Sequence, residues 1–366
     1  MRRWTINGRF LAQPGTGVQR YAQEIVRSLD RRLAGDPALA AGLRIEIVAP
    51  PDACDPPGLE AIRFRRAGGY GGHAWEQTVL PRHAPGGLLS LCNTGPVAHR
   101  RQILCIHDMN TRRCPESYSL AFRAAYRLLL PLLGRSASAI ATVSRHSAAE
   151  IARAGIRAQG EILVIPNGYE HVARWKPARP PARGSVGRDT ILLVGSLAAH
   201  KNVGLVLGLA NRLAEIGLRI AVVGATDPRV FRDAGLPPAR NVVALGRLAD
   251  AELAFVLKAC FCLAFPSRVE GFGLPPLEAM ALGCPVVVSD CASLPEVCGQ
   301  AALYASPDDP EAWLRGFRAL AASQELRVGL VARGRARAGG FRWADSAGRY
   351  LEAMARADGV EVSGAA

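Results

Sequence analysis

The sequence has 366 residues, more than a typical single domain, so its length predicts two domains. Hydrophobic residues make up 49% and charged residues 21% of the chain, which excludes a disordered, collagen-like or coiled-coil protein. The net charge of +14 is uneven: residues 1–170 hold 22 basic and 13 acidic side chains, or +9, which leaves +5 for the rest. This charge suits a nucleic acid, an anionic membrane surface or a phosphorylated small molecule, and an arginine-rich solvated surface is an equal alternative.

The cysteines and the first residues bear on the compartment. None of the nine cysteines belongs to a Cys-x-x-Cys pair, so neither a disulfide framework nor a zinc site is indicated, and a reducing cytosol is expected. The segment from Met1 to Gly8 lacks an apolar stretch of signal-peptide length, and no run of eighteen apolar residues occurs anywhere. We therefore expect a cytoplasmic protein whose membrane contact is peripheral at most.

In the first half, short apolar runs rich in β-branched residues alternate with longer helical patterns. This alternation predicts an α/β domain with a parallel, doubly wound sheet over residues 1–170. Residues 51–87 are rich in Pro and Gly and are expected to form a loop. The candidate strands are Ile45–Ala49, Ile103–His107, Ile140–Val143 and Ile162–Ile165.

The second half repeats this pattern after a linker at residues 171–188, whose Pro, Arg and Gly favour neither helix nor strand. A second Rossmann-like domain is expected over residues 189–342, and a last helix at about 343–358 is expected to pack back on the first domain. Two such sheets facing each other would leave a cleft for a ligand. The candidate strands are Ile191–Val194, Ile220–Val223, Val242–Leu245, Phe261–Phe265, Val286–Ser289 and Ala302–Tyr304.

The segment from Phe265 to Met280 carries the strongest chemical signal. It follows a buried strand, contains a Gly-rich turn and enters a helix through prolines. Backbone N–H groups and the helix dipole favour an anion at such a place, and the glycines allow a phosphate to approach. Glu270 precedes the turn and Glu278 is expected about two helical turns into the helix, so both carboxylates can face one ligand.

These residues resemble the E-x7-E motif of the retaining glycosyltransferases of family 4, which have the GT-B fold of two facing Rossmann-like domains. The likeness extends along most of the chain. It includes a first Gly-rich loop at Gly15–Tyr21, the pair His107-Asp108, the segments Val143–Ser147 and Ile165–Gly168, a diphosphate loop from Val194 to Lys201-Asn202, and Gly283-x-Pro285-Val286-Val287.

The resemblance implies a role for each matching residue. Lys201 is one of only three lysines in the chain. In a transferase of this family it would stabilise the leaving diphosphate. Glu270 would hold the donor sugar, Glu278 would bind the ribose hydroxyls, and His107 would contact the sugar near its anomeric carbon. The catalytic set is then Glu270, His107 and Lys201, and the donor-binding set is Gly17, Ser196, Arg247, Leu248, Gly271, Phe272, Gly273, Leu274 and Glu278.

Two departures from the family pattern concern charge. Relatives commonly have an arginine in the diphosphate loop, whereas this loop reads Ser196-Leu197-Ala198-Ala199-His200-Lys201. The second cation is therefore absent, replaced by His200, or supplied by an arginine such as Arg247 or Arg268. Asn7 occupies a position where relatives often have Asp. This difference bears on the role of the first Gly-rich loop more than on the fold.

The resemblance implies transfer of a hexose, most often mannose, from a nucleotide-diphosphate sugar such as GDP-mannose to a saccharide or lipid-diphosphate-linked saccharide, with retained configuration. The first domain would bind the acceptor and the second the donor, in polysaccharide biosynthesis at the inner membrane face. No D-x-D motif is evident, so no divalent metal and no cofactor beyond the nucleotide sugar is expected. The alternatives are a nucleotide-sugar epimerase or phosphorylase of the same fold, or a basic binding protein. The sequence lacks nucleic-acid-binding signatures, so no nucleic-acid partner is expected.

Overall fold

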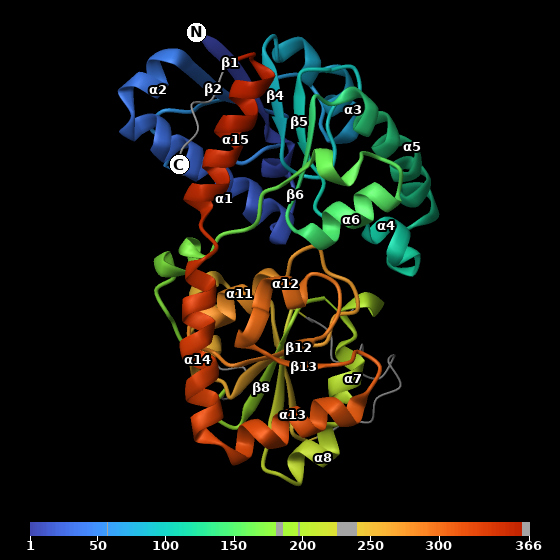
Figure 1. Cartoon of the computed structure of the whole chain (residues 1–366), viewed down its shortest axis with the longest axis vertical. Helices are drawn as coiled ribbons and strands as arrows, with labels where there is room; N and C mark the ends of the chain where they lie inside the picture. Colours follow the sequence, from blue (N-terminus) through green and yellow to red (C-terminus); the bar gives the residue numbers. More distant parts are fainter. Residues whose placement is uncertain (57, 181–185, 197, 225–239, 361–366) are drawn as a thin grey trace. The chain divides into compact units, whose positions relative to one another are not determined.

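A computed structural model describes the chain except residues 57, 181–185, 197, 225–239 and 361–366. The chain forms two compact units, here called unit 1 and unit 2 (Figure 1). Unit 1 comprises residues 1–112, 119–168 and 342–366, and unit 2 comprises residues 113–118 and 169–341. Each unit is built on a parallel sheet with packed helices, which confirms the predicted α/β class with two Rossmann-like domains.

Unit 1 contains a seven-stranded parallel sheet in the order β3-β2-β1-β4-β5-β6-β7. Its strands are β1 (Arg2–Asn7), β2 (Leu43–Ala49), β3 (Arg63–Arg66), β4 (Gly87–Ser90), β5 (Gln102–Cys105), β6 (Ala139–Thr142) and β7 (Ile162–Val164). Its helices are α1 (Gly17–Gly35), α2 (Pro37–Gly42), α3 (Gly72–Thr78), α4 (Asn110–Arg113), α5 (Leu120–Ser136), α6 (Arg145–Arg153) and α15 (Trp343–Ala357).

The expectation of a loop over residues 51–87 was wrong, because this stretch contains β3 and α3. Three strands of unit 1 were also missed, namely β1, β3 and β4. Each has few consecutive apolar residues: β1 reads RRWTIN, β3 reads RFRR and β4 reads GLLS. These apolar residues are too few in a row to form a recognisable strand pattern, and pairing with neighbouring strands completes the sheet.

Unit 2 contains a six-stranded parallel sheet in the order β10-β9-β8-β11-β12-β13, and all six strands were predicted. They are β8 (Thr190–Val194), β9 (Arg219–Val223), β10 (Val242–Gly246), β11 (Cys262–Phe265), β12 (Val286–Ser289) and β13 (Leu303–Ala305). The helices are α7 (Val203–Leu207), α8 (Ala210–Ala214), α10 (Asp250–Ala259), α11 (Leu274–Ala281), α12 (Leu294–Cys298), α13 (Pro310–Ala322) and α14 (Gln324–Gly339).

Strand order fixes where each sheet can receive a ligand. In unit 1 the chain reverses its direction of travel across the sheet between β1 and β4, and in unit 2 it does so between β8 and β11. In open α/β sheets, the carboxyl ends of the strands beside such a switch point leave a crevice in which ligands bind. The loops after β8 and β11 are the two that carry Lys201 and Glu270.

The C-terminal helix α15 belongs to unit 1, where it lies beside α1 (Figure 1). The buried phenol of Tyr350 lies 2.9 Å from that of Tyr21, which in turn donates to the Ile165 carbonyl at 3.0 Å. The Ser346 hydroxyl donates to the Pro166 carbonyl at 2.6 Å. Tyr21 is therefore a packing residue. Residues 181–185 of the predicted linker lie outside the described residues, and the 3-10 turn Glu170–Arg174 is part of unit 2.

Candidate functional site

Lys201 and Glu270 form an ion pair at the switch point of unit 2. The Lys201 ammonium donates to Glu270 Oε1 at 2.6 Å and lies 5.6 Å from the centre of the Phe265 ring. Neither side chain is fully buried, with 24% of Lys201 and 11% of Glu270 exposed. The structure thus brings together two residues that are 69 positions apart in the sequence and that were each predicted to be catalytic.

Loops after three neighbouring strands are held to each other beside this pair. The Gly195 N–H donates to the Val223 carbonyl at 3.0 Å, and the Gly224 N–H donates to the Gly246 carbonyl at 2.8 Å. A Cβ on Gly224, whose φ is +102°, would lie 2.6 Å from the Gly195 carbonyl oxygen, so only glycine fits there. Ser196 is exposed directly after β8, and Arg247 and Leu248 follow β10. Leu197 lies outside the described residues.

The turn before α11 presents backbone donors. No described residue accepts a hydrogen bond from the N–H groups of Phe272, Gly273 or Leu274. Pro275 and Pro276 have no N–H, so the donors at this helix end are confined to the turn itself. Gly273 caps the helix with φ +104°, and a Cβ there would lie 2.8 Å from Leu294. Consecutive N–H groups at a helix N-terminus form an anion site.

A residue that sequence reasoning missed holds this turn. The Ser293 hydroxyl lies 2.8 Å from the Phe272 carbonyl oxygen and 3.1 Å from that of Glu270, and Ser293 is fully buried. Its single O–H donates to one of these carbonyls or is shared between them, and so ties the turn to Ser293 at the start of α12. Nothing in the spacing of Ser293 distinguishes it from an ordinary loop serine, so the sequence offered no signal.

Glu278 has a buried partner. It lies a little more than one turn into α11, not two as expected, because the helix begins only at Leu274. Its Oε1 lies 2.9 Å from Nε2 of His171, whose side chain is fully buried and packs against Trp175. This bond uses one of the two carboxylate oxygens and fixes the carboxylate in place. His171 was also missed, since a histidine near a Pro-rich stretch carries no pattern.

The surroundings of His200 disfavour its charged form in the unliganded protein. Burial lowers its pKa, and the Lys201 charge lowers it further, although Glu270 and Glu116 act in the opposite direction. Its Nδ1 lies 3.0 Å from the Ser117 hydroxyl, and at neutral pH the ring is uncharged. Arg268 pairs with Asp308, whereas Arg247 is exposed and forms no ion pair with the described residues.

His107 lies just past the end of β5 in unit 1. Its Nε2 donates to the Leu91 carbonyl at 2.7 Å, and its ring meets Tyr21 edge-on at 4.8 Å. Burial lowers the pKa of His107 to about 4, although the Leu91 carbonyl raises it, so the imidazole is neutral at pH 7. With Nε2 donating, Nδ1 is the nitrogen that can accept a hydrogen bond. The ring can orient a polar group but cannot act as a cation.

Gly17 begins α1, and Thr16 caps the helix by accepting from the Val18 N–H at 3.3 Å. A Cβ on Gly15 or Gly17 would meet no atom of the described chain within 4 Å. The packing of the protein therefore does not explain these glycines, and the space above them is open.

A buried polar network that sequence reasoning missed lies at the switch point of unit 1. The Glu76 carboxylate, with no exposed area, accepts from Asn7 Nδ2 at 2.7 Å, Arg9 Nε at 3.0 Å and Thr94 Oγ1 at 2.8 Å. Asn7 also lies 3.3 Å from the Ser90 hydroxyl. An Asp at position 7, as relatives often have, would place a second negative charge against the Glu76 carboxylate. Asn7 instead donates a hydrogen bond to Glu76, so the buried Glu76 accounts for this departure from the family pattern.

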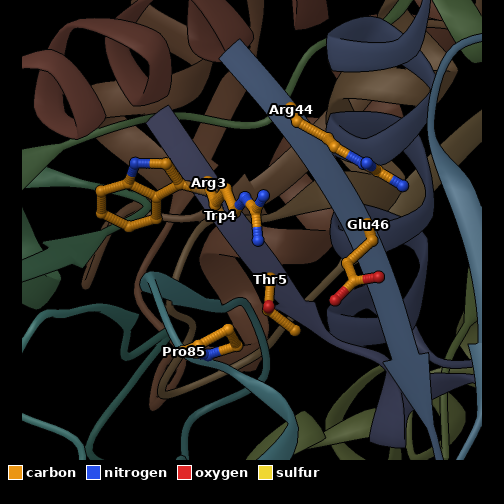
Figure 2. A pocket seen from close by; sticks show the side chains of 6 residues that line it. All are labelled: Arg3, Trp4, Thr5, Arg44, Glu46 and Pro85. Atoms are coloured by element: carbon orange, nitrogen blue, oxygen red, sulfur yellow. The ribbon is translucent and has the colours of Figure 1, made fainter. Parts of the chain in front are cut away.

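The cavity of about 160 Å³ in Figure 2 lies elsewhere in unit 1. Its walls come mainly from β1 and β2 and include none of the predicted site residues. Within the described ranges, no helix is long and apolar enough to cross a membrane, and no three His, Cys, Asp or Glu side chains gather in a metal-binding group. The cavity is lined by Arg3, Trp4, Thr5, Arg44, Glu46 and Pro85.

Comparisons with known proteins bear on the family and on the fold. Residues 188–323 match the family model of glycosyl transferases group 1. The O-antigen chain mannosyltransferase RfbU of Salmonella typhimurium is 29% identical over 217 residues, which cover 58% of this chain and 59% of that protein. The O-antigen chain mannosyltransferase B of Escherichia coli is 42% identical over 99 residues, 27% of this chain and 26% of that protein. The matches thus span only part of these relatives.

Solved structures match nearly the whole chain at low identity. Sucrose-phosphate synthase from Thermosynechococcus elongatus has a TM-score of 0.72 and 18% identity, with 98% of this chain and all of that one covered. Anabaena HepE in complex with UDP and glucose has a TM-score of 0.68 and 16% identity, with coverage of 97% and 99%. Residues 188–323 therefore match the group 1 glycosyltransferases, and the chain has the GT-B fold of two Rossmann-like domains.

Proposed function

We propose that the protein is a retaining glycosyltransferase of family 4 that moves a mannose-type hexose from a nucleotide-diphosphate sugar to a saccharide or lipid-linked saccharide in cell-surface polysaccharide biosynthesis. The observation that carries the proposal is the Lys201–Glu270 pair, 2.6 Å long, at the switch point of unit 2. The mannosyltransferase names of the partial relatives support the donor class. GDP-mannose is the donor we propose.

Lys201 and the turn before α11 supply the positive charge that the leaving diphosphate needs. As the bond between the sugar and the diphosphate breaks, negative charge grows on the phosphate oxygens. We propose that the Lys201 ammonium, which is partly exposed, and the N–H groups of Phe272, Gly273 and Leu274 stabilise this charge. We also propose that these groups make a divalent metal unnecessary and that Arg247 adds a further cation.

No enzymic nucleophile is needed in this proposal. The acceptor oxygen forms its bond to the anomeric carbon on the face from which the diphosphate departs, and the acceptor proton passes to a phosphate oxygen of the leaving group. Glu270 positions the donor sugar, and Glu278, fixed by His171, binds the ribose hydroxyls. The contact of His107 with the sugar stays a prediction from the sequence. A location at the inner membrane face is part of the proposal.

A nucleotide screen tests the donor assignment. We expect one series among GDP, UDP, ADP and their sugar conjugates to raise the unfolding temperature, because a ligand of the folded state stabilises it by mass action. Calorimetry should give a dissociation constant for that series. The binding should survive EDTA and weaken about tenfold or more in Glu278→Gln, but not in Glu325→Gln, which changes an exposed residue of α14. Absence of binding by every nucleotide would contradict the proposal.

Glu270→Gln is expected to separate binding from turnover. In the unliganded protein the Glu270 carboxylate neutralises Lys201 and so competes with a phosphate for it. Removing that charge should leave the affinity for the free nucleoside diphosphate unchanged or higher, whereas the rate at which the nucleoside diphosphate is released from the nucleotide sugar should fall about 100-fold. Calorimetry measures the affinity, and a coupled assay for the nucleoside diphosphate measures the rate. A parallel loss of both would mean that Glu270 has no separate role toward the sugar.

A further inference from the structure

The loop after β8 holds His200 directly beside Lys201. Both residues belong to the 3-10 turn Ala199–Lys201. The His200 carbonyl accepts a hydrogen bond from the Arg268 N–H at 2.8 Å, and the ring nitrogen Nδ1 lies 3.0 Å from the Ser117 hydroxyl. Both partners lie in other segments of unit 2, so the backbone and the ring of His200 are each fixed.

The charges of the candidate site act on this ring. Burial lowers the pKa of His200, which is only 8% exposed, and the Lys201 ammonium lowers it further. The carboxylates of Glu270 and Glu116 have the opposite effect and raise the pKa of His200. Since the Glu270 carboxylate lies 2.6 Å from the Lys201 ammonium, a negative charge held by Lys201 is close enough to stabilise the imidazolium.

A bound nucleotide sugar changes this balance in one direction. Each phosphate of its diphosphate carries a negative charge, so a diphosphate at Lys201 brings more negative charge than the Glu270 carboxylate does. Negative charge near an imidazole favours the protonated form and raises its pKa. Because the ordinary pKa of histidine, about 6.5, lies close to neutral pH, a shift of this kind changes the charge of the ring.

The hydrogen bonds of the ring are compatible with both protonation states. The Ser117 hydroxyl can donate to Nδ1 or accept from it, so this contact survives when the ring is protonated. The other ring nitrogen, Nε2, forms no hydrogen bond with the part of the chain that the structure describes. In the imidazolium this nitrogen carries an N–H, for which a phosphate oxygen is a strong acceptor.

We propose that His200 takes up a proton from solvent when the diphosphate of the nucleotide sugar binds at Lys201, and so adds a positive charge to the donor site only while the donor is bound. No covalent bond of the donor changes in this step, and the proton returns to solvent when the nucleoside diphosphate leaves. The inference rests on the proposed function, because it requires a nucleotide sugar in unit 2. It makes the affinity for the donor depend on pH.

The sign of this dependence follows from the protonation states of His200. In the free protein the ring is neutral, and in the complex its pKa is raised. The affinity for the donor therefore rises as the pH falls through the pKa of the complex, and the gain is complete below the lower pKa of the free protein. Above the pKa of the complex the ring is neutral in both states, and His200 no longer affects the pH dependence.

Calorimetry in two buffers counts the protons. The heat of GDP-mannose binding is measured at pH 7 in buffers that differ in their enthalpy of ionisation, and the difference gives the number of protons taken up. We expect net uptake by the wild type and none by His200→Gln. GDP-mannose is the probe because both of its phosphates are esterified, whereas the terminal phosphate of a free nucleoside diphosphate itself titrates at about pH 6.

The affinity should show the same linkage. Between pH 8 and pH 6 the affinity of the wild type for GDP-mannose should rise by about fivefold or more relative to that of His200→Gln. The matched control is His83→Gln, which removes a histidine of unit 1 that belongs to none of the predicted sites. This variant should take up protons and change its affinity as the wild type does.

NMR titration of the wild type provides a test that does not depend on the folding of a variant. The ring signal that is absent from His200→Gln, or that shifts on nucleotide binding, should titrate at a higher pH with GDP-mannose than without it. Binding of GDP-mannose without proton uptake, or with an unchanged or lower pKa of His200, would overturn this inference and leave the donor assignment intact. Absence of GDP-mannose binding at any pH from 6 to 8 would overturn both proposals.

Discussion

Lys201→Ala is expected to slow release of the nucleoside diphosphate from the nucleotide sugar by about 100-fold or more, because the charge on the leaving group then lacks a cationic hydrogen-bond donor. The affinity for the free nucleoside diphosphate should fall by about tenfold to 100-fold, the effect of losing a hydrogen bond to a charged group. In the unliganded protein His200 is uncharged at neutral pH and Arg268 is paired with Asp308, so neither replaces the Lys201 ammonium there. Calorimetry gives the affinity and a coupled assay the rate.

Lys258 provides the matched control, since it is an exposed lysine on α10 of the same unit. Lys258→Ala removes the same charge from the surface and should change neither quantity by more than about twofold. A modest loss of stability is expected in Lys201→Ala alone, because Glu270 then lacks its partner. Equal rates in the two variants would show that Lys201 is an ordinary surface cation.

The sequence predicts unit 2 better than unit 1 for a physical reason. Strands buried on both faces of a parallel sheet need runs of apolar residues, and β8 (TILLV) and β12 (VVVS) have them. In unit 1, β1 also lies inside the sheet, but its apolar residues are only Trp4 and Ile6, which alternate with polar residues. The strand β3 has a single apolar residue. Such strands exist because a neighbour pairs with them, and pairing is not visible in a local pattern.

The candidate site also contains residues that the sequence predicts and residues that it does not. Lys201, Glu270 and Glu278 belong to a recognisable sequence pattern, and the structure places Lys201 and Glu270 in contact. Ser293, which orients the turn, and His171, which fixes Glu278, act through bonds between segments distant in sequence. Residues that support a site are determined by the packing around it, so a single sequence does not reveal them.

Glu76→Gln is expected to destabilise unit 1 by about 3–5 kcal/mol, since it leaves the Arg9 charge buried without its counter-ion. The side chains are 8% and 0% exposed, so water cannot replace the lost partner. Urea denaturation measures the loss. Glu46→Gln is the matched control: Glu46 pairs with Arg65 at the same 3.0 Å, but the side chains are 25% and 39% exposed, and the loss should stay below about 1 kcal/mol.

The difference between wild type and Glu76→Gln should also depend on pH. Burial alone would raise the pKa of Glu76, but hydrogen bonds from His73, Asn7 and Thr94 and the charge of Arg9 outweigh it and lower the pKa. A carboxylate whose pKa is lower in the folded state contributes full stability above its unfolded pKa of about 4.3 and loses it as the pH falls through the folded value. The two proteins should therefore unfold with converging free energies in acid. Glu46→Gln should show no comparable convergence. Equal losses of unfolding free energy in the two variants at neutral pH would mean that the buried ion pair of Glu76 stabilises the protein no more than the exposed pair of Glu46.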